Sequence, residues 1–283
     1  NASPHFIDSE MEHFGVDPVK LDLYLKKNTY INKNFCINRK TKKIIRVLIV
    51  VHVFGHPAKI NEIISIAKKY KIKVLEDAAE ALGSFYRKKH VGTFGDIGIL
   101  SFNGNKIITT GGGGVIITND LNFAKKARYL STTAKIPHPW TFEHDLIGWN
   151  DRMPNLNASL GCAGLEQLES KILAKKLLHK KYTQKFRNLE NCEIMTSSLN
   201  SVSNNWLVTL RLLNKNVGEA KLIRDELLKQ SHMRGIYLRP IWNLMSEMKM
   251  YSSCQKGKLD NSEEQVNRIL NLPSSPQLIQ ISK

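Results

Sequence analysis

The chain has 283 residues, of which 42% are hydrophobic and 8% aromatic. This length exceeds one average domain, and the composition supplies a buried core, which excludes an intrinsically disordered protein. The formal net charge of +17 would suit a nucleic-acid partner or an anionic small molecule. The lysines are spread along helical faces without interleaved aromatic residues or a nucleic-acid motif, so we expect solvated helix surfaces and no nucleic-acid binding.

The cysteines and the apolar runs exclude further classes. Four cysteines lie far apart without a Cys-x-x-Cys pair, which argues against a zinc cluster or a disulfide framework. We expect reduced thiols in a cytoplasmic protein, and no metal site. The longest apolar run, Ile44 to Phe54, is too short to span a bilayer and is interrupted by Arg46 and His52. Because no signal peptide opens the chain, we expect no membrane partner.

The first 40 residues are polar and irregular and contain one predicted helix, over residues 18–26. Asp17 can cap this helix and Pro18 can occupy its first turn. The chain does not begin with Met, and its first ten residues, NASPHFIDSE, contain neither a helix start nor a strand. We expect an amino-terminally incomplete chain.

The next part predicts a βαβ unit. Residues 44–51 are β-branched and nearly unbroken, as in a strand covered on both faces. An apolar stripe predicts a helix over residues 59–71, and the short strand 72–75 then leads to Asp77. Such units imply a parallel sheet that binds ligands at the carboxyl ends of its strands, so Asp77 stands at a binding edge.

Two more strands, at 97–102 and 115–118, and a helix over 121–130 are predicted to follow. Residues 131–156 contain three prolines and two tryptophans. We expect them to form an ordered loop, because so many aromatic side chains would not be left in solvent.

A long helix is predicted over residues 157–186, bridging two domains. Beyond it, the pattern predicts strands at 206–213 and 235–239, a helix at 217–230, and a helix from Ser262 in which Gln265 completes a capping box. The expected organisation is a partial large domain (1–156), the bridging helix (157–186) and a small α+β domain (187–283).

The chemistry is concentrated between residues 73 and 119. A pyridoxal phosphate enzyme needs a lysine for an imine, an acid beside the pyridine nitrogen and donors for the phosphate. Lys106, Asp77 and Ser101 are candidates for these roles. The alternative readings are a solvated lysine, a strand-end acid that caps a helix and a structural hydroxyl. The run Gly111–Gly114 lacks the Gly-Lys-Ser/Thr ending of a P-loop and predicts a tight turn instead.

From Pro4 to Pro273 the sequence resembles the DegT/DnrJ/EryC1/StrS family of sugar aminotransferases. The matching stretches are VHVFGHP, EDAAEALGS, VGTFGDIGILSFNGNKIITTGGGG, IGWNDRMPNLNASLGCAGLEQLE and YLRPIW. GNKIITTGGGG, KIPHPW, RPIWNLMSEMKMY and LNLPSS are most similar to the LegC-type branch, which makes 4-amino-4,6-dideoxy sugars for legionaminic acid or bacillosamine. The resemblance implies a type I pyridoxal phosphate transferase fold, an α/β architecture with a mainly parallel sheet flanked by helices and a small α+β domain.

The resemblance also implies roles for single residues. Lys106 matches the family's imine lysine, and Asp77 matches the aspartate that pairs with the pyridine nitrogen. Ser101 matches a serine that contacts the phosphate. Glu80 stands where many relatives have a glutamine near the cofactor's phenolic oxygen, and a carboxylate there has to be protonated or paired.

A homodimer is implied as well, because Asn150 and Arg152 lie in a stretch with which relatives reach the phosphate of the neighbouring subunit's cofactor. Here Trp149 and Asp151 replace two tyrosines of that stretch, and Gly112 replaces a glutamate of the glycine run. These replacements leave a structural loop as the alternative for residues 149–152.

The implied reaction moves an amino group, usually from glutamate, to C4 of a nucleotide-linked 4-keto-6-deoxy-N-acetylhexosamine; UDP and GDP both remain open. His52, His138 and Arg239 are candidate substrate contacts, although a lone loop histidine is more often structural. A dehydratase of the family has histidine in place of the lysine, and Lys106 is present. The remaining alternative is a non-catalytic or regulatory member of the fold, or an inactive fragment.

Relatives begin with a segment whose Gly-Thr/Ser turn holds the cofactor phosphate with backbone donors. We expect this chain to start after that segment. We therefore expect residues 1–283 alone to be aggregation-prone and without turnover.

Overall fold

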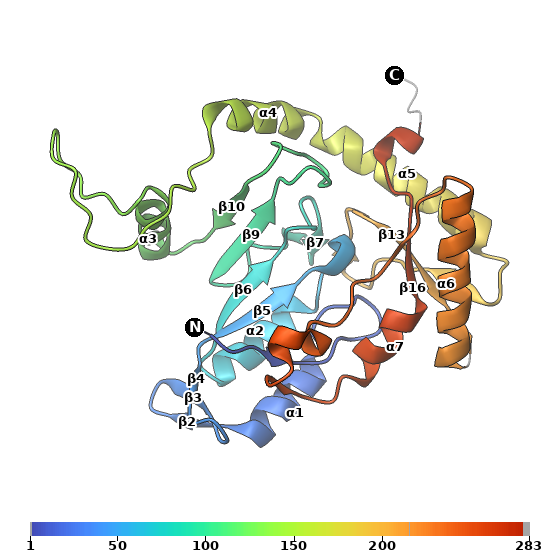
Figure 1. The fold of residues 1–283 in the computed structure, drawn as a ribbon, viewed down its shortest axis with the longest axis horizontal. Helices are drawn as coiled ribbons and strands as arrows, with labels where there is room; N and C mark the ends of the chain where they lie inside the picture. Colours follow the sequence, from blue (N-terminus) through green and yellow to red (C-terminus); the bar gives the residue numbers. More distant parts are fainter. Residues whose placement is uncertain (1, 215, 280–283) are drawn as a thin grey trace.

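The computed structural model describes residues 2–214 and 216–279. Two four-stranded sheets lie side by side with helices packed around them (Figure 1). The helices are α1 (Pro18–Asn28), α2 (Ile60–Lys69), α3 (Leu121–Ser131), α4 (Asn155–Glu166), α5 (Leu168–Phe186), α6 (Val217–Met233) and α7 (Asp260–Arg268). Within these described residues, no helix combines the length and the apolar character needed to cross a membrane.

The first sheet carries the predicted chemistry. Its strands are β5 (Val47–Val51), β6 (Lys73–Asp77), β9 (Ile97–Ser101) and β10 (Gly114–Ile117), in the order β10-β9-β6-β5. The strands β5, β6 and β9 are parallel, and β10 joins β9 antiparallel. The unit β5-α2-β6 therefore confirms the predicted βαβ pattern.

Helix α2 covers only one face of this sheet. Val50 and Val74 are buried beneath it, whereas Val47 and Ile49 on the other face are 50% and 60% exposed. The prediction of a strand covered on both faces is therefore wrong for β5 in this chain. An unbroken apolar run indicates that both faces of a strand are covered. It does not indicate whether the covering elements come from the same chain.

The predicted strand 44–51 is also divided. Its first part forms β4 (Ile44–Ile45) in a small sheet of its own with β2 (Thr29–Asn32) and β3 (Phe35–Asn38). The hairpin between β2 and β3 turns at Lys33, whose φ of 52° is in the left-handed region. Lysine is not among the residues that favour a left-handed turn conformation. The sequence therefore predicted irregular structure before residue 40 and not a hairpin.

The second sheet has the order β11-β13-β16-β14 and is antiparallel throughout. Its strands are β11 (Cys192–Ile194), β13 (Val208–Leu212), β14 (Arg239–Pro240) and β16 (Ile269–Leu272). The short strands elsewhere are β1 (His5–Phe6), β7 (Phe85–Tyr86), β8 (Lys89–His90), β12 (Ser201–Val202) and β15 (Gln255–Lys256). Because β12 pairs with β7, the chain beyond residue 187 returns to the first half.

The predicted helix over 157–186 is two helices, α4 and α5, which meet at Gln167 (Figure 1). The capping box at Ser262 is also wrong, because α7 already begins at Asp260. Instead, Asp8 accepts hydrogen bonds from the backbone amides of Asn261 (3.0 Å) and Ser262 (2.8 Å). A carboxylate distant in sequence therefore caps this helix, which local patterns do not reveal.

Residues 131–154 form an arm that extends away from the sheets (Figure 1). Trp140 is 76% exposed and Phe142 is 77% exposed. The expectation that the aromatic residues of this loop are covered is therefore wrong for the single chain. Burial of these rings depends on what packs against the arm, which composition does not specify.

We expect Gly98→Ala to lower the free energy of unfolding by at least about 2 kcal/mol. A Cβ at Gly98 would lie 1.9 Å from the carbonyl oxygen of Gly92, so β9 would have to move. The matched control is Gly104→Ala, whose Cβ would meet nothing within 4 Å. Equal stability of the two variants in chemical denaturation would contradict this packing.

Candidate active site

The site lies at the carboxyl ends of β6 and β9. Asp77 is opposite Ile99 in the parallel register, and Ser101 is two residues farther along β9. Side chains on neighbouring strands in register, and at i and i+2, share one face. Asp77 and Ser101 therefore share the sheet face opposite α2. The Asp77 carboxylate accepts a hydrogen bond from the backbone amide of Ala79 (3.1 Å).

Lys106 follows β9 in a tight turn, in which its amide donates to the carbonyl of Asn103 (3.0 Å). Its side chain is only 13% exposed. The ammonium lies 4.0 Å from the centre of the Trp206 ring and 3.6 Å from Oε1 of Glu80. A cation on an aromatic face beside a carboxylate is held electrostatically on two sides.

The Glu80 side chain is 11% exposed and lies beside Lys106. Its Oε2 accepts a hydrogen bond from the backbone amide of Phe54 (2.8 Å). Burial raises the pKa of the Glu80 carboxyl, the charge of Asp77 adds to this effect, and the Phe54 amide and Lys106 offset part of it. The structure thus pairs this carboxylate with the lysine, as its burial requires.

A segment that the sequence did not indicate holds both loops of the site. The Nδ2 of Asn204 donates to the carbonyls of Glu80 (2.8 Å) and Leu82 (2.9 Å), and the Trp206 indole donates to the carbonyl of Asn105 (2.9 Å). These residues come from the second half of the chain. Nothing in the sequence Ser-Asn-Asn-Trp distinguishes such a role from an ordinary turn before a strand.

Glu76 was also missed as a key residue. It is fully buried and accepts hydrogen bonds from the backbone amides of Gly92 (2.8 Å), Phe94 (2.6 Å) and Gly95 (2.6 Å). The Nε2 of His52 donates to Oε2 of Glu76 (3.0 Å), the oxygen that also accepts from Gly92. Burial alone raises the pKa of Glu76, but the hydrogen bonds from His52 and the backbone outweigh it and place the pKa below its ordinary value.

His52 is buried in this network and not at Lys106. Its Nδ1 accepts from the amide of Ala58 (3.1 Å), and its Nε2 is engaged by Glu76. Both ring nitrogens thus have protein partners, so this candidate for substrate contact has no free donor or acceptor. Its contact with substrate stays a prediction.

The other predicted contacts are not gathered around Lys106 within this chain. His138 and Asn150 are exposed in the arm, and Arg239 is exposed in β14. The Nδ1 of His138 accepts from the backbone amide of Thr141 (3.0 Å). These positions stay predictions.

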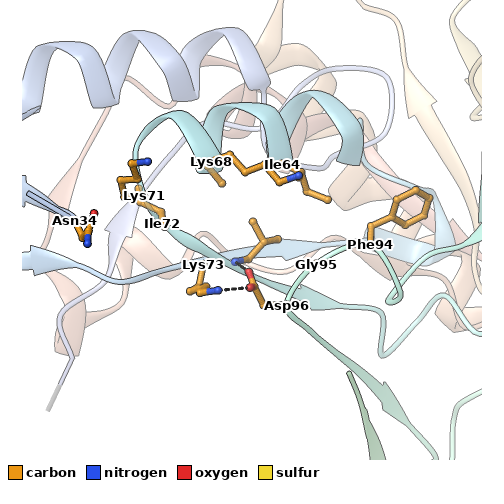
Figure 2. Close-up of a pocket in the computed structure, with 11 residues that line it drawn as sticks. Asn34, Ile64, Lys68, Lys71, Ile72, Lys73, Phe94, Gly95 and Asp96 are labelled. Atoms are coloured by element: carbon orange, nitrogen blue, oxygen red, sulfur yellow. Dashed lines mark hydrogen bonds and ion pairs between the residues drawn. The ribbon is translucent and has the colours of Figure 1, made fainter. Parts of the chain in front are cut away.

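The cavity around Lys106 is small. Ser101, Glu80 and Trp206 line it with the lysine, and its volume of about 10 Å³ has room for about one water molecule. A larger hollow of about 510 Å³ lies at the opposite, amino-terminal end of β6 (Figure 2). That hollow contains the exposed pair of Lys73 and Asp96, 2.7 Å apart, and no group of the predicted chemistry.

Comparison with known proteins identifies the class. Residues 1–281 match the DegT/DnrJ/EryC1/StrS aminotransferase family, and the chain belongs to this family. A crystal structure of a family member from Brucella abortus superposes with a TM-score of 0.86 at 23% identity, over 99% of this chain and 70% of that one. The predicted type I transferase fold is thereby confirmed.

Curated relatives agree on the family but differ in what they are named for. The chain is 35% identical, over 85% of its length, to the putative pyridoxal phosphate-dependent aminotransferase EpsN of Bacillus subtilis, and covers 58% of it. It is 33% identical, over 98% of its length, to GDP-perosamine synthase of Escherichia coli O157:H7, and covers 69% of it. The predicted family is confirmed, while the LegC-type branch stays a prediction.

The buried Glu76 predicts a pH dependence. A carboxyl whose pKa is lowered by folding stabilises the native state above its unfolded pKa, near 4.5, and this contribution is lost as the pH falls through the folded value. We expect Glu76→Gln to lower the free energy of unfolding at pH 7 by about 2–4 kcal/mol. The variant should also lose part of the destabilisation that acid causes in the parent protein.

Urea unfolding followed between pH 7 and pH 3 measures both effects. The control is Glu190→Gln, which changes an exposed carboxylate. If Glu76→Gln and Glu190→Gln had the same free energy of unfolding and the same pH profile, the hydrogen bonds from Glu76 to residues 92–95 would not stabilise the protein.

Proposed function

We propose that this protein is a pyridoxal phosphate-dependent aminotransferase that moves an amino group from glutamate to C4 of a nucleotide-linked 4-keto-6-deoxy-N-acetylhexosamine. The observation that carries the proposal is the shielded Lys106 amine next to Glu80, at the strand ends that also carry Asp77 and Ser101. Family membership supports the reaction class.

The residues present fit this cofactor in chemistry. The set contains an amine that is 13% exposed, a carboxylate at a strand end and a hydroxyl on the same sheet face. A cavity of about 10 Å³ does not hold an aromatic ring, so the Lys106 side chain has to leave the Trp206 ring when the cofactor binds. The sheet face that bears Asp77 and Ser101 is open, as the exposed Val47 and Ile49 show.

Each residue has a distinct task in this proposal. The cofactor, when bound, supplies the electron sink. Asp77 would hold a proton on the pyridine nitrogen, because an adjacent anion favours the protonated ring. The Nζ of Lys106 would bind the cofactor and carry protons to and from the substrate, and Ser101 Oγ would donate to the phosphate. Glu80 would accept from the Lys106 ammonium and keep it near the strand ends.

The substrate class rests on several weaker observations. One relative is named a dTDP-4-amino-4,6-dideoxy-D-glucose transaminase, which supports C4, and others are named for GDP-perosamine. The net charge of +17 suits the anionic diphosphate group of a nucleotide sugar. The legionaminic acid or bacillosamine pathway rests on the sequence motifs alone. A non-catalytic role is less favoured because Lys106 is present with its surroundings intact.

We further propose a homodimer in the cytoplasm. The arm carries Asn150, and its exposed rings would be buried in a subunit interface. The four cysteines are free, as thiols are in a reducing compartment. In such a dimer, the arm would bring Asn150 to the partner's cofactor.

The lysine and the aspartate have separable roles. Lys106→Ala should abolish the visible to near-ultraviolet absorbance of bound pyridoxal phosphate, because the imine to the protein can no longer form. Asp77→Asn should retain some binding but lose turnover by about two orders of magnitude or more, because the ring nitrogen is no longer held protonated. Lys68→Ala, which changes an exposed lysine, is the control.

Turnover should be assayed with glutamate on UDP- and GDP-linked 4-keto sugars. A cofactor band that survives in Lys106→Ala would remove this lysine from the site. Cofactor binding without turnover on either sugar would retain the cofactor site and reject the proposed substrate.

A substitution in the arm tests the proposed dimer. We expect Ile147→Asp, at a position 85% exposed in the single chain, to convert a dimer into a monomer in size-exclusion chromatography with light scattering, because a buried charge without a partner is costly. Leu199→Asp, at a position 87% exposed outside the arm, is the control. A dimer that persists in Ile147→Asp would exclude this part of the arm from the interface.

A further inference from the structure

A cluster of ligand-type side chains lies away from Lys106, in the loop between β1 and α1. Glu10, Glu12 and His13 each place one oxygen or nitrogen within 4.8 Å of the others. Glu10 and His13 are buried, and Glu12 is exposed. The scattered cysteines predict no metal site, and this cluster uses none of them.

The orientation of His13 is the informative feature. Its Nδ1 contacts Oε1 of Glu10, and its ring is 0% exposed. A carboxylate accepts, so Nδ1 carries the proton and Nε2 presents a lone pair. Within the described chain this Nε2 has no hydrogen-bond partner, and it faces Oε2 of Glu12 at 3.6 Å. An unpaired buried nitrogen is costly and calls for an explanation.

We propose that His13 Nε2 and Glu12 Oε2 form a binding site for a divalent transition metal of the zinc class. Two ligand atoms at tetrahedral zinc bond lengths lie roughly 3.3–3.4 Å apart, close to the observed 3.6 Å. Glu10 orients the imidazole through Nδ1, the arrangement in which a carboxylate fixes a metal-binding histidine. Water completes the coordination.

Lys59 competes with the metal. Its ammonium lies 2.7 Å from Oε2 of Glu10 and 3.3 Å from Oε2 of Glu12, so it now neutralises both carboxylates. The Lys59 side chain is 37% exposed and can turn into solvent when a metal enters. This competition weakens binding, and it predicts that removal of the ammonium strengthens binding.

The metal would stabilise a loop that contacts the second sheet and α7. Gln265 in α7 donates to the carbonyl of Glu10 (3.2 Å), and Arg211 in β13 donates to the carbonyl of Met11. The loop that bears the cluster is thus attached to the second sheet. The site is independent of the aminotransferase chemistry proposed for Lys106.

Titration with Zn²⁺ alone by calorimetry, and with Co²⁺ as a visible-absorbing substitute, tests the proposal. We expect one site per chain whose affinity falls at least roughly tenfold in Glu12→Gln, since even a residue that only orients a ligand costs that much. Glu12 is exposed, so this variant should fold. Lys59→Met should tighten binding, and Glu143→Gln, an exposed carboxylate in the arm, should change nothing.

His13→Asn provides a second check if its thermal unfolding stays cooperative, because it removes the nitrogen ligand. The Co²⁺ absorption bands should disappear in this variant and in Glu12→Gln. Metal binding that is equal in the parent protein, Glu12→Gln and Lys59→Met would overturn the proposal, as would no binding in the parent protein and in Lys59→Met.

Discussion

The buried carboxylate of Glu76 is the interaction on which the site depends. It gathers three backbone amides of the loop 92–95 and the His52 ring around the end of β6. Successive strand residues point to opposite faces, so fixing Glu76 on the α2 side directs Asp77 to the open side. In the proposed function Asp77 would meet one ring atom of the cofactor, and it would need such a rigid support because small displacements of reacting groups are costly.

The two halves of the chain meet at Lys106. The first half supplies the lysine and Glu80, whereas the second half supplies the Trp206 ring and the amide of Asn204. A shift of the second sheet would therefore change the surroundings of the amine directly.

The open sheet face and the arm both expose apolar side chains to solvent. Val47 and Ile49 on the face that bears Asp77, and Trp140 in the arm, leave apolar surface in water. Such surface is stabilised when another layer covers it, at about 25 cal/mol per Å². The chain spans 58% of the EpsN relative. Asp77 and Ser101 lie on this open face of the sheet.

Local patterns in the sequence determined the elements with strong periodicity and clear caps: α1 after Asp17, the βαβ unit, and the positions of Asp77 and Lys106 at strand ends. They did so because helix caps and apolar periods act over a few residues. Only the tertiary structure decided that both ring nitrogens of His52 are engaged, that Asp8 caps α7 from 253 residues away, and that Trp206 covers the lysine. Those interactions join segments distant in sequence, and no local pattern encodes their pairing.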